Sequence, residues 1–252
     1  MIPVEDGTTL PLLYHLNSEP WMNLEAYAQH SYEVEFKHET GEEVALPAPG
    51  EGSQLMRVLA ARGSCRQYVA REMPLETLGT LLGGAYGLTR LNQLDSGIRF
   101  HSRPVPSAGG LYPLELYVMT ERVAGVQNGI HHFAAAANTL SLLQPFPPRE
   151  KLTELFLSQY FLENANALVM ISAVFPRTLR KYGARGYRYV LLEAGHVAQT
   201  ICLLATEQGL GSLCMGGFWD ARLNAFLHFD GTTQAVVYCV GVGYPASGAG
   251  LK

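Results

Sequence analysis

The sequence lacks any apolar run long enough to cross a lipid bilayer. Its longest apolar stretches are interrupted by Glu193, His196 and Gln199 or by glycines, whereas a membrane-spanning helix needs about 20 consecutive apolar residues. The N-terminus also lacks the basic start, the apolar core and the small-residue cleavage site of a secretory signal. We therefore expect no membrane partner and a cytoplasmic location.

The sequence also lacks a strong excess of positive or negative charge. Charged residues make up 16% of the 252 residues, the formal net charge is -4 and the pI is about 6.1. Nucleic-acid binding proteins usually carry a strong basic excess, so we expect no nucleic-acid partner. The hydrophobic share of 48% is large enough for a sizeable core in one large domain or two fused halves.

Cysteine is scarce, and the familiar metal and hydrolase motifs are missing. The four cysteines are scattered without a C-x-x-C pair, which predicts neither a zinc site nor a disulfide framework but reduced, mostly buried thiols. His131 and His132 are neighbours in a predicted strand and point to opposite faces, so they are poorly placed to share a metal. His15 and His196 are isolated and fit structural roles. No G-x-S-x-G or H-E-x-x-H segment occurs.

Residues 1–50 have weak periodicity and end in a proline-rich stretch at residues 46–50. We expect an arm or lid there, followed by one domain at residues 51–252. Ser53 can cap a helix that leads to Arg62, and Pro74 suits the first turn of another helix that reaches Gly83 and Gly84. The longest helical pattern runs from about residue 186 to 208 and stops at Gly209.

Strand patterns occupy residues 114–120, 130–133, 139–143, 167–174 and 235–241, with a turn near Asn138 between the second and the third. Hairpins and helices alternate irregularly, unlike the strand–helix repeat of a doubly wound sheet. The order favours an α+β architecture with helices packed on a short mixed sheet.

Two arginines and a serine lie close together in the segment Arg62-Gly63-Ser64-Cys65-Arg66. Bidentate charged donors beside a neutral donor suit a phosphate ester. The same five residues also fit a solvated basic helix end that complements the helix dipole.

A ten-residue segment rich in proline, serine and glycine spans residues 104–113. Prolines fix its ends, and its small residues leave the backbone amides open to a flat ligand. An ordinary glycine-rich loop is an equally good reading of the segment taken alone.

Residues 209–218 offer two more places where backbone can approach a ring. They do not form a dinucleotide fingerprint, because Cys214 occupies the last glycine position and the segment follows a helix, so a Rossmann-bound NAD is disfavoured. Lys181 and Tyr182 precede the long helix, where either side chain could exchange a proton if burial lowered its pKa. A surface pair is the plainer interpretation of that dipeptide.

Taken in order, these segments resemble the SagB-type dehydrogenases of the FMN-dependent nitroreductase superfamily, a group that includes azoline oxidases. The resemblance covers roughly residues 60 to 245. It is carried by the following segments: Arg62-x-Ser64-x-Arg66, residues 106–115, Lys181-Tyr182-Gly183, residues 185–189, residues 192–196, Gly209-Leu210-Gly211 and Gly241-x-Gly243-Tyr244-Pro245.

The resemblance implies a nitroreductase-like α+β homodimer with two FMN sites at the subunit interface. Arg62, Ser64 and Arg66 would hold the phosphate and ribityl chain. The partner's loop would pack on the isoalloxazine through Pro106, Ser107, Ala108, Gly109 and Gly110, and Met215, Gly216 and Gly217 would line the ring. Many relatives place a further basic phosphate ligand after the Gly-Tyr-Pro segment, and Lys252 is the candidate for that role here.

The resemblance further implies oxidation of a thiazoline or oxazoline to the aromatic azole. A base from the Lys181–Tyr182 pair would remove the ring Cα proton as hydride leaves Cβ for flavin N5, and oxygen would then reoxidise the FMN. The substrate would be a free or carrier-bound peptide, with a cyclodehydratase or synthetase as partner. The alternatives are an NAD(P)H-dependent nitro or quinone reductase and a non-catalytic flavin-binding scaffold subunit. We expect no metal.

Overall fold

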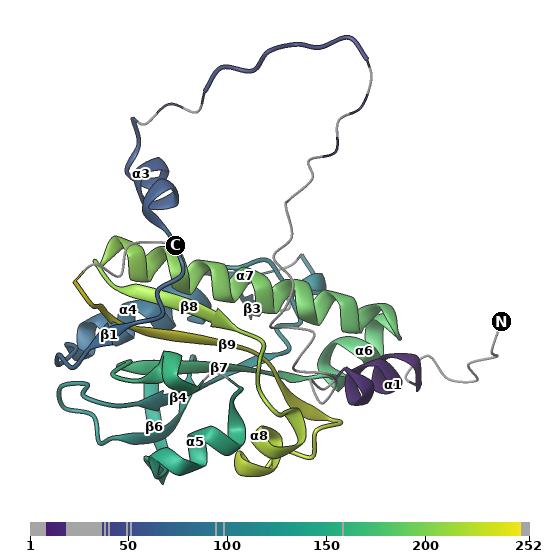
Figure 1. Ribbon diagram of the computed structural model, residues 1–252. Coiled ribbons are helices and arrows are strands. Elements are labelled where there is room, and N and C mark those ends of the chain that lie inside the picture. Colours follow the sequence, from purple (N-terminus) through teal and green to yellow (C-terminus); the bar gives the residue numbers. More distant parts are fainter. Residues whose placement is uncertain are drawn as a thin grey trace.

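A twisted antiparallel sheet forms the centre of the computed structural model (Figure 1), which describes residues 9–18, 37, 39, 41–48, 50, 52–93, 95–97, 99–157 and 159–247. The strands of the sheet are β1 (Tyr68–Val69), β4 (Leu114–Thr120), β5 (Gly129–Ala134), β6 (Thr139–Pro145), β7 (Ala167–Val174), β8 (Gly211–Met215) and β9 (Gln234–Pro245). Their order is β1-β9-β7-β4-β5-β6, and β8 pairs with β9. A separate hairpin consists of β2 (Leu91–Gln93) and β3 (Arg99–His101).

Helices cover both faces of the sheet. The described α-helices are α1 (Thr9–Asn17), α3 (Gln54–Ala61), α4 (Leu75–Tyr86), α5 (Arg149–Leu155), α6 (Pro176–Tyr182), α7 (Arg185–Glu207) and α8 (Asp220–Phe226), and the short 3-10 turns are η1 (Ala108–Gly110) and η2 (Gln159–Leu162). Helices α4 and α7 pack on one face, and α5 and α8 pack on the other (Figure 1).

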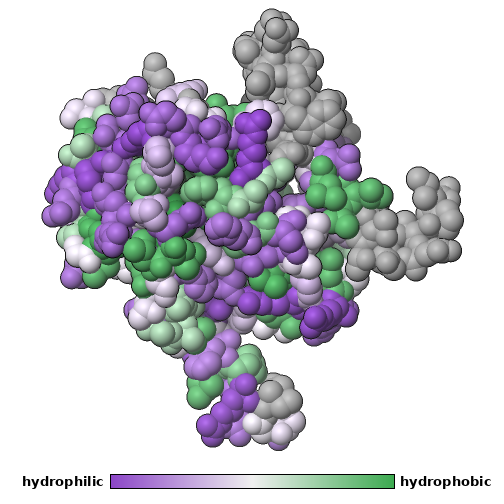
Figure 2. Space-filling view, turned by 90° about the horizontal axis from the view of Figure 1, so that it is seen from below, coloured by the Kyte–Doolittle hydropathy of each residue, from purple (hydrophilic) through white to green (hydrophobic). Residues whose placement is uncertain are grey.

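Alternation along the strands divides the core into two layers. On β7, Val169 and Ile171 point into the layer under α4 and α7, whereas Leu168 and Met170 point into the layer under α5 and α8. This is the period of two expected of a strand buried on both sides. The outer surface of the α5 and α8 layer mixes hydrophilic and apolar residues (Figure 2).

Most predicted helices and strands are confirmed. The Ser53 hydroxyl accepts from the Met56 amide at 3.2 Å and caps α3, the long helix ends before Gly209, whose φ is +71°, and Asn138 takes φ +53° in the predicted turn. The α+β nitroreductase-like class is also confirmed. However, every strand pairing of the sheet is antiparallel, and parallel pairing is confined to isolated bridges such as Ser64 with Ser212.

The structure differs from the prediction at Gly83 and Gly84, which lie inside α4 rather than at its end. A Cβ on Gly84 would come 2.8 Å from Cδ1 of Leu204 on α7. The glycine therefore serves close packing of two helices instead of stopping one. Pro74 precedes the first helical residue of α4 by one position and acts as its N-cap.

Helix α7 is the one described helix that is long and apolar enough, by composition, to cross a membrane. In this fold it packs against α4, α6, β8 and β9. Its apolar character is that of a core helix, because Val190, Val197 and Ile201 are fully buried on the side that faces the sheet.

Candidate active site

The predicted phosphate-binding segment runs along the first half of β8. Ser64 forms an isolated bridge with Ser212, and the Cys65 amide donates to the Ser212 carbonyl at 2.8 Å. Arg62 ends α3, and both Arg62 and Arg66 are exposed. The Arg66 guanidinium lies 5.7 Å from the centroid of the Phe161 ring, and Arg62 lies near Cys202 and Cys214. The segment thus brings to one strand the residue types that bind a phosphate ester.

The absence of a side chain at Gly211 of β8 allows this close approach. A Cβ on Gly211 would lie 2.5 Å from both Cβ and Sγ of Cys65, so only glycine fits there. The Tyr68 hydroxyl ties the same segment down by donating to the Cys65 carbonyl at 3.0 Å. Contacts with β8 and with Tyr68 thus fix the backbone between Arg62 and Arg66.

Residues 215–217 follow at the end of β8. The Met215 side chain is buried in the core layer under α5 and α8, so only its backbone is placed to face a ligand. A Cβ on Gly216 would meet nothing within 4 Å, which leaves open space beside the chain. Gly217 is held from behind by the Leu157 amide, which donates to its carbonyl at 3.0 Å.

The loop of residues 104–113 has an unusual backbone. Gly109, Gly110 and Tyr112 have φ values of +64°, +65° and +44°, and the last is uncommon for a residue with a side chain. The Ser107 hydroxyl accepts from the Tyr112 amide at 2.9 Å, and the Ser107 carbonyl accepts from the Gly110 amide at 3.0 Å. Strained backbone of this kind is concentrated at functional sites.

Lys181 and Tyr182 lie in the last turn of α6 and reach this loop. A Cβ on Gly109 would come 2.7 Å from Tyr182 Oη and 2.8 Å from Lys181 Nζ. Lys181 Nζ lies 5.3 Å from the centroid of the Tyr182 ring, and that ring meets Tyr189 edge-on at 5.1 Å. The structure therefore gathers an amine and a phenol at one glycine of the loop.

Sequence reasoning assigned no role to Glu193, which is 2% exposed on α7. Its carboxylate accepts from the Tyr86 hydroxyl at 2.7 Å and from the Ser107 hydroxyl. Burial raises the pKa of Glu193, while these two hydrogen bonds and then Arg103 and His196 oppose the rise. The sequence signal that could have found Glu193 is its spacing, which follows the helical period of the apolar residues Val190 and Val197.

Two thiols meet near Arg62. Cys202 Sγ on α7 lies 3.6 Å from Cys214 Sγ on β8. The hydrogen bond from Cys202 lowers the pKa of Cys214 to about 6, with smaller contributions from Tyr238 and Arg62. All four cysteines are free thiols and three are buried, as predicted.

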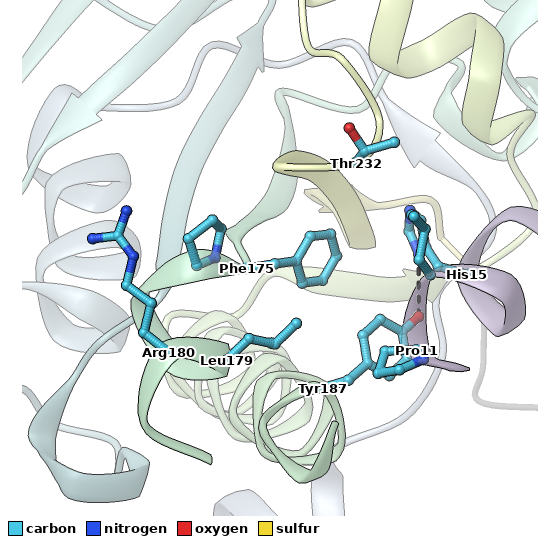
Figure 3. Close-up of a pocket in the computed structure, with 9 residues that line it drawn as sticks. Pro11, His15, Phe175, Leu179, Arg180, Tyr187 and Thr232 are labelled. Carbon is cyan, nitrogen blue, oxygen red and sulfur yellow. Dashed lines mark hydrogen bonds between the residues drawn. The ribbon is translucent and has the colours of Figure 1, made fainter. Parts of the chain in front are cut away.

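A cavity lies between α1, α6 and the start of α7. This cavity of about 260 Å³ is lined by Phe175, Leu179 and Tyr187 and, on the side of α1, by Pro11 and His15 (Figure 3). The His15 ring lies 3.1 Å from the Tyr187 hydroxyl. Burial raises the pKa of Tyr187 to about 12, so the hydroxyl keeps its proton at neutral pH.

The predicted site residues thus form two groups in one chain. The first contains Arg62, Ser64, Arg66 and residues 215–217, all along β8. The second contains residues 106–110 together with Lys181 and Tyr182. Lys252 lies outside the described residues.

The fold and these two groups define an α+β protein of the nitroreductase type, and a family model agrees. The nitroreductase family matches residues 59–244. The chain belongs to this family. A protein of Methanocaldococcus jannaschii, classed provisionally as a nitroreductase, is 36% identical over 73% of this chain and 89% of its own length.

Three further matches come from the same comparisons. The microcin B17-processing protein McbC of Escherichia coli is 30% identical over 53% of this chain, which spans about half (51%) of McbC. The E. coli microcin synthetase McbBCD complex with truncated pro-MccB17 shares the fold, with a TM-score of 0.67 at 22% identity, covering 90% of this chain and 82% of the other. A nitroreductase-fold protein from Desulfovibrio desulfuricans in complex with FMN has a TM-score of 0.50 at 14% identity, covering 77% and 87%.

Proposed function

We propose that this oxidoreductase binds FMN and oxidises thiazoline or oxazoline rings of a peptide to the aromatic azoles, with oxygen as the final electron acceptor. The observation that carries the proposal is the contact of Lys181 and Tyr182 with Gly109. It places an amine and a phenol at the loop that would cover the flavin ring. A proton acceptor is needed at that place if ring oxidation removes a carbon-bound proton.

The residues present fit FMN. Arg62, Arg66 and the Ser64 hydroxyl offer the donors that a phosphate monoester takes. A Cβ added at Gly110 or at Gly216 would meet nothing within 4 Å, which leaves backbone accessible to a flat ring. Bound FMN would supply the redox chemistry by accepting hydride from the azoline.

The placement of the two groups supports a homodimer. Arg62 lies near Cys202, whereas Lys181 precedes the first residue of α7, Arg185. Between Arg185 and Cys202 the helix rises about 25 Å, further than the reach from the phosphate of FMN to the reactive edge of its ring. We propose that each flavin site takes its phosphate ligands from one protomer and Lys181 with Tyr182 from the other.

Exposed apolar side chains supply a surface for that dimer. Helix α3 has no buried residue, and its apolar residues Leu55 and Leu59 are 59% and 43% exposed. Leu191 and Leu192 of α7 are 37% and 54% exposed. Such residues on two adjacent helices favour burial against a second copy of the chain.

In the proposed reaction, the protein's own groups handle the proton and the orientation. The Lys181–Tyr182 pair would take the ring Cα proton, and the loop at Gly109 would help to orient the azoline. Orientation of this kind contributes to catalysis because reacting atoms must meet in one geometry. The similarity to McbC, a microcin B17-processing protein, and to the fold of the McbBCD synthetase complex supports a peptide substrate and a synthetase partner.

A nitro or quinone reductase that uses NAD(P)H is the second candidate, favoured by the relative from M. jannaschii. Anaerobic mixing of the FMN-loaded protein with a thiazoline-containing peptide, and separately with NADPH, distinguishes the two. We expect the peptide to bleach the flavin absorbance and to lose two hydrogens by mass. Bleaching by NADPH without reaction of the peptide would reject the azoline oxidase.

A further inference from the structure

A single buried carboxylate joins α7 to the loop that precedes β4. Glu193 accepts from the hydroxyls of Ser107 and Tyr86, the latter at 2.7 Å. Each hydroxyl in turn accepts a backbone amide: Ser107 Oγ from Tyr112 at 2.9 Å and Tyr86 Oη from Leu114 at 3.2 Å. Glu193 therefore fixes two backbone positions, one in the loop and one at the first residue of β4.

The two relays hold backbone that is otherwise strained. Tyr112, whose amide ends the Ser107 relay, has a φ of +44°. Left-handed residues with side chains persist only where the surroundings fix them. Within each relay the amide-to-hydroxyl and hydroxyl-to-carboxylate bonds form a chain, and chained hydrogen bonds strengthen each other in a buried environment.

Arg103 completes the network from the other side. Its guanidinium lies 4.2 Å from the centroid of the Tyr86 ring and 5.4 Å from that of Tyr112, and it donates to the Tyr86 carbonyl. The Arg103 amide donates to the Tyr112 hydroxyl at 3.1 Å. A buried carboxylate is tolerated when hydroxyl donors and a nearby cation compensate it.

We infer that Glu193 is a positioning residue, which sets the loop of residues 106–110 through Ser107 and Tyr86 and thereby places Gly109 against Lys181 and Tyr182. Ser107 is two residues from Gly109, so movement of one moves the other. The inference rests on the proposed function for what the loop binds, but the placement of the loop is measured independently of flavin.

The test is Glu193→Gln in the full chain. Gln keeps the shape of the side chain but has one acceptor oxygen in place of two, so one hydroxyl loses its acceptor. We expect hydrogen exchange of the loop amides in residues 104–114 to quicken about tenfold or more, while exchange in β7 and β9 stays unchanged. Glu207→Gln, at the exposed end of the same helix where the carboxylate accepts from Gln54, is the control and should leave loop exchange unaltered.

Single relays are tested by Ser107→Ala and Tyr86→Phe. The first should release mainly the Tyr112 amide and the second mainly the Leu114 amide. The effect of Ser107→Ala should be smaller in the Glu193→Gln background, because the two residues act in one relay. These variants keep the inference falsifiable if Glu193→Gln alone fails to fold.

Flavin and turnover provide the functional readout. We expect Glu193→Gln to lower kcat for the azoline about tenfold or more and to shift the visible spectrum of bound FMN, with KM changed less than threefold. Unaltered loop exchange in Glu193→Gln and Ser107→Ala would overturn the inference. Failure of the wild-type protein to bind FMN would instead overturn the proposed function, with the loop result still standing.

Discussion

At the scale of single residues, the charge of Arg66 provides a test of the proposed phosphate site. Arg66→Ala leaves phosphate charge less compensated beside β8, so we expect FMN affinity to fall about tenfold or more. Quenching of flavin fluorescence on titration measures it. Arg99→Ala, an exposed arginine on β3, is the control and should bind FMN as the wild type does. Equal affinity in Arg66→Ala would remove this guanidinium from the phosphate site.

The thiol of Cys214 gives a pH-dependent prediction. Its pKa is lowered to about 6 by the hydrogen bond from Cys202, so its thiolate fraction should rise between about pH 5 and pH 7. Alkylation of Cys214 by iodoacetamide, followed by peptide mass spectrometry, should therefore reach its plateau near pH 7. Cys202→Ala removes the donor and should move the rise to higher pH. A wild-type profile that climbs only above pH 8 would contradict this.

Glu193 illustrates what residue patterns do not reveal. The motif segments were identifiable because they combine rare residue types within a few positions. Glu193 meets Tyr86 and Ser107 across 107 and 86 positions of sequence, and no local pattern encodes such a meeting. A carboxylate in the apolar stripe of a helix predicts a buried partner but not which one.

At the scale of elements, the packing of α6 on α7 holds Lys181 in place. A Cβ on Gly186 would lie 3.1 Å from the backbone carbonyl group of Thr178, which cannot rotate away. We expect Gly186→Ala to destabilise the fold by about 1–3 kcal/mol, as other overpacked sites do. Thermal or urea unfolding monitored by circular dichroism measures the change.

The matched control for that variant lies in α4. A Cβ on Gly79 would meet nothing within 4 Å, and the residue is in the helix interior. Gly79→Ala should therefore stabilise the protein by about 0.5–1 kcal/mol. If Gly186→Ala stabilised the protein to the same extent, the close contact between α6 and α7 would not be limiting.

Elements with strong periodicity were predictable, and short ones were not. The long helix α7 and strands β4, β5, β6, β7 and β9 have clear hydrophobic patterns over several residues. Strand β8 was missed because glycine and serine fill residues 211–212, and its pairing with β9 is decided by tertiary contacts. The short helices α5, α6 and α8 likewise depend on packing rather than on propensity.

At the scale of the whole molecule, we predict an obligate homodimer. Leu192→Glu places a charge on the exposed apolar stripe of α7 and should yield monomers with little FMN. Leu143 on β6 has the same exposure, 54%, and Leu143→Glu should remain dimeric. Light scattering after size exclusion, with flavin absorbance per chain, measures both. A wild-type monomer that holds one FMN per chain would contradict the shared site.

The assembly of the proposed site from two chains is the part that sequence patterns could not establish. The residues of the Arg62 and Lys181 groups were identified as separate motifs, and the resemblance placed them across a subunit boundary. The structure supports two groups along α7 in one chain, while the distance between the flavin ring and Lys181 depends on contacts between chains. The role of residues 1–50 as an arm or lid stays a prediction, although α1 covers the cavity beside Tyr187.

The measurement that tests the central claim most directly is the rate of flavin reduction by a thiazoline peptide under anaerobic rapid mixing. We predict that Lys181→Ala and Tyr182→Phe retain FMN and the dimer but reduce their flavin roughly 10²–10⁴-fold more slowly than the wild type. Dithionite-reduced flavin in both variants should react with oxygen at a near-normal rate, because that half-reaction does not use the base. Equal reduction rates in the wild type and both variants would contradict the account.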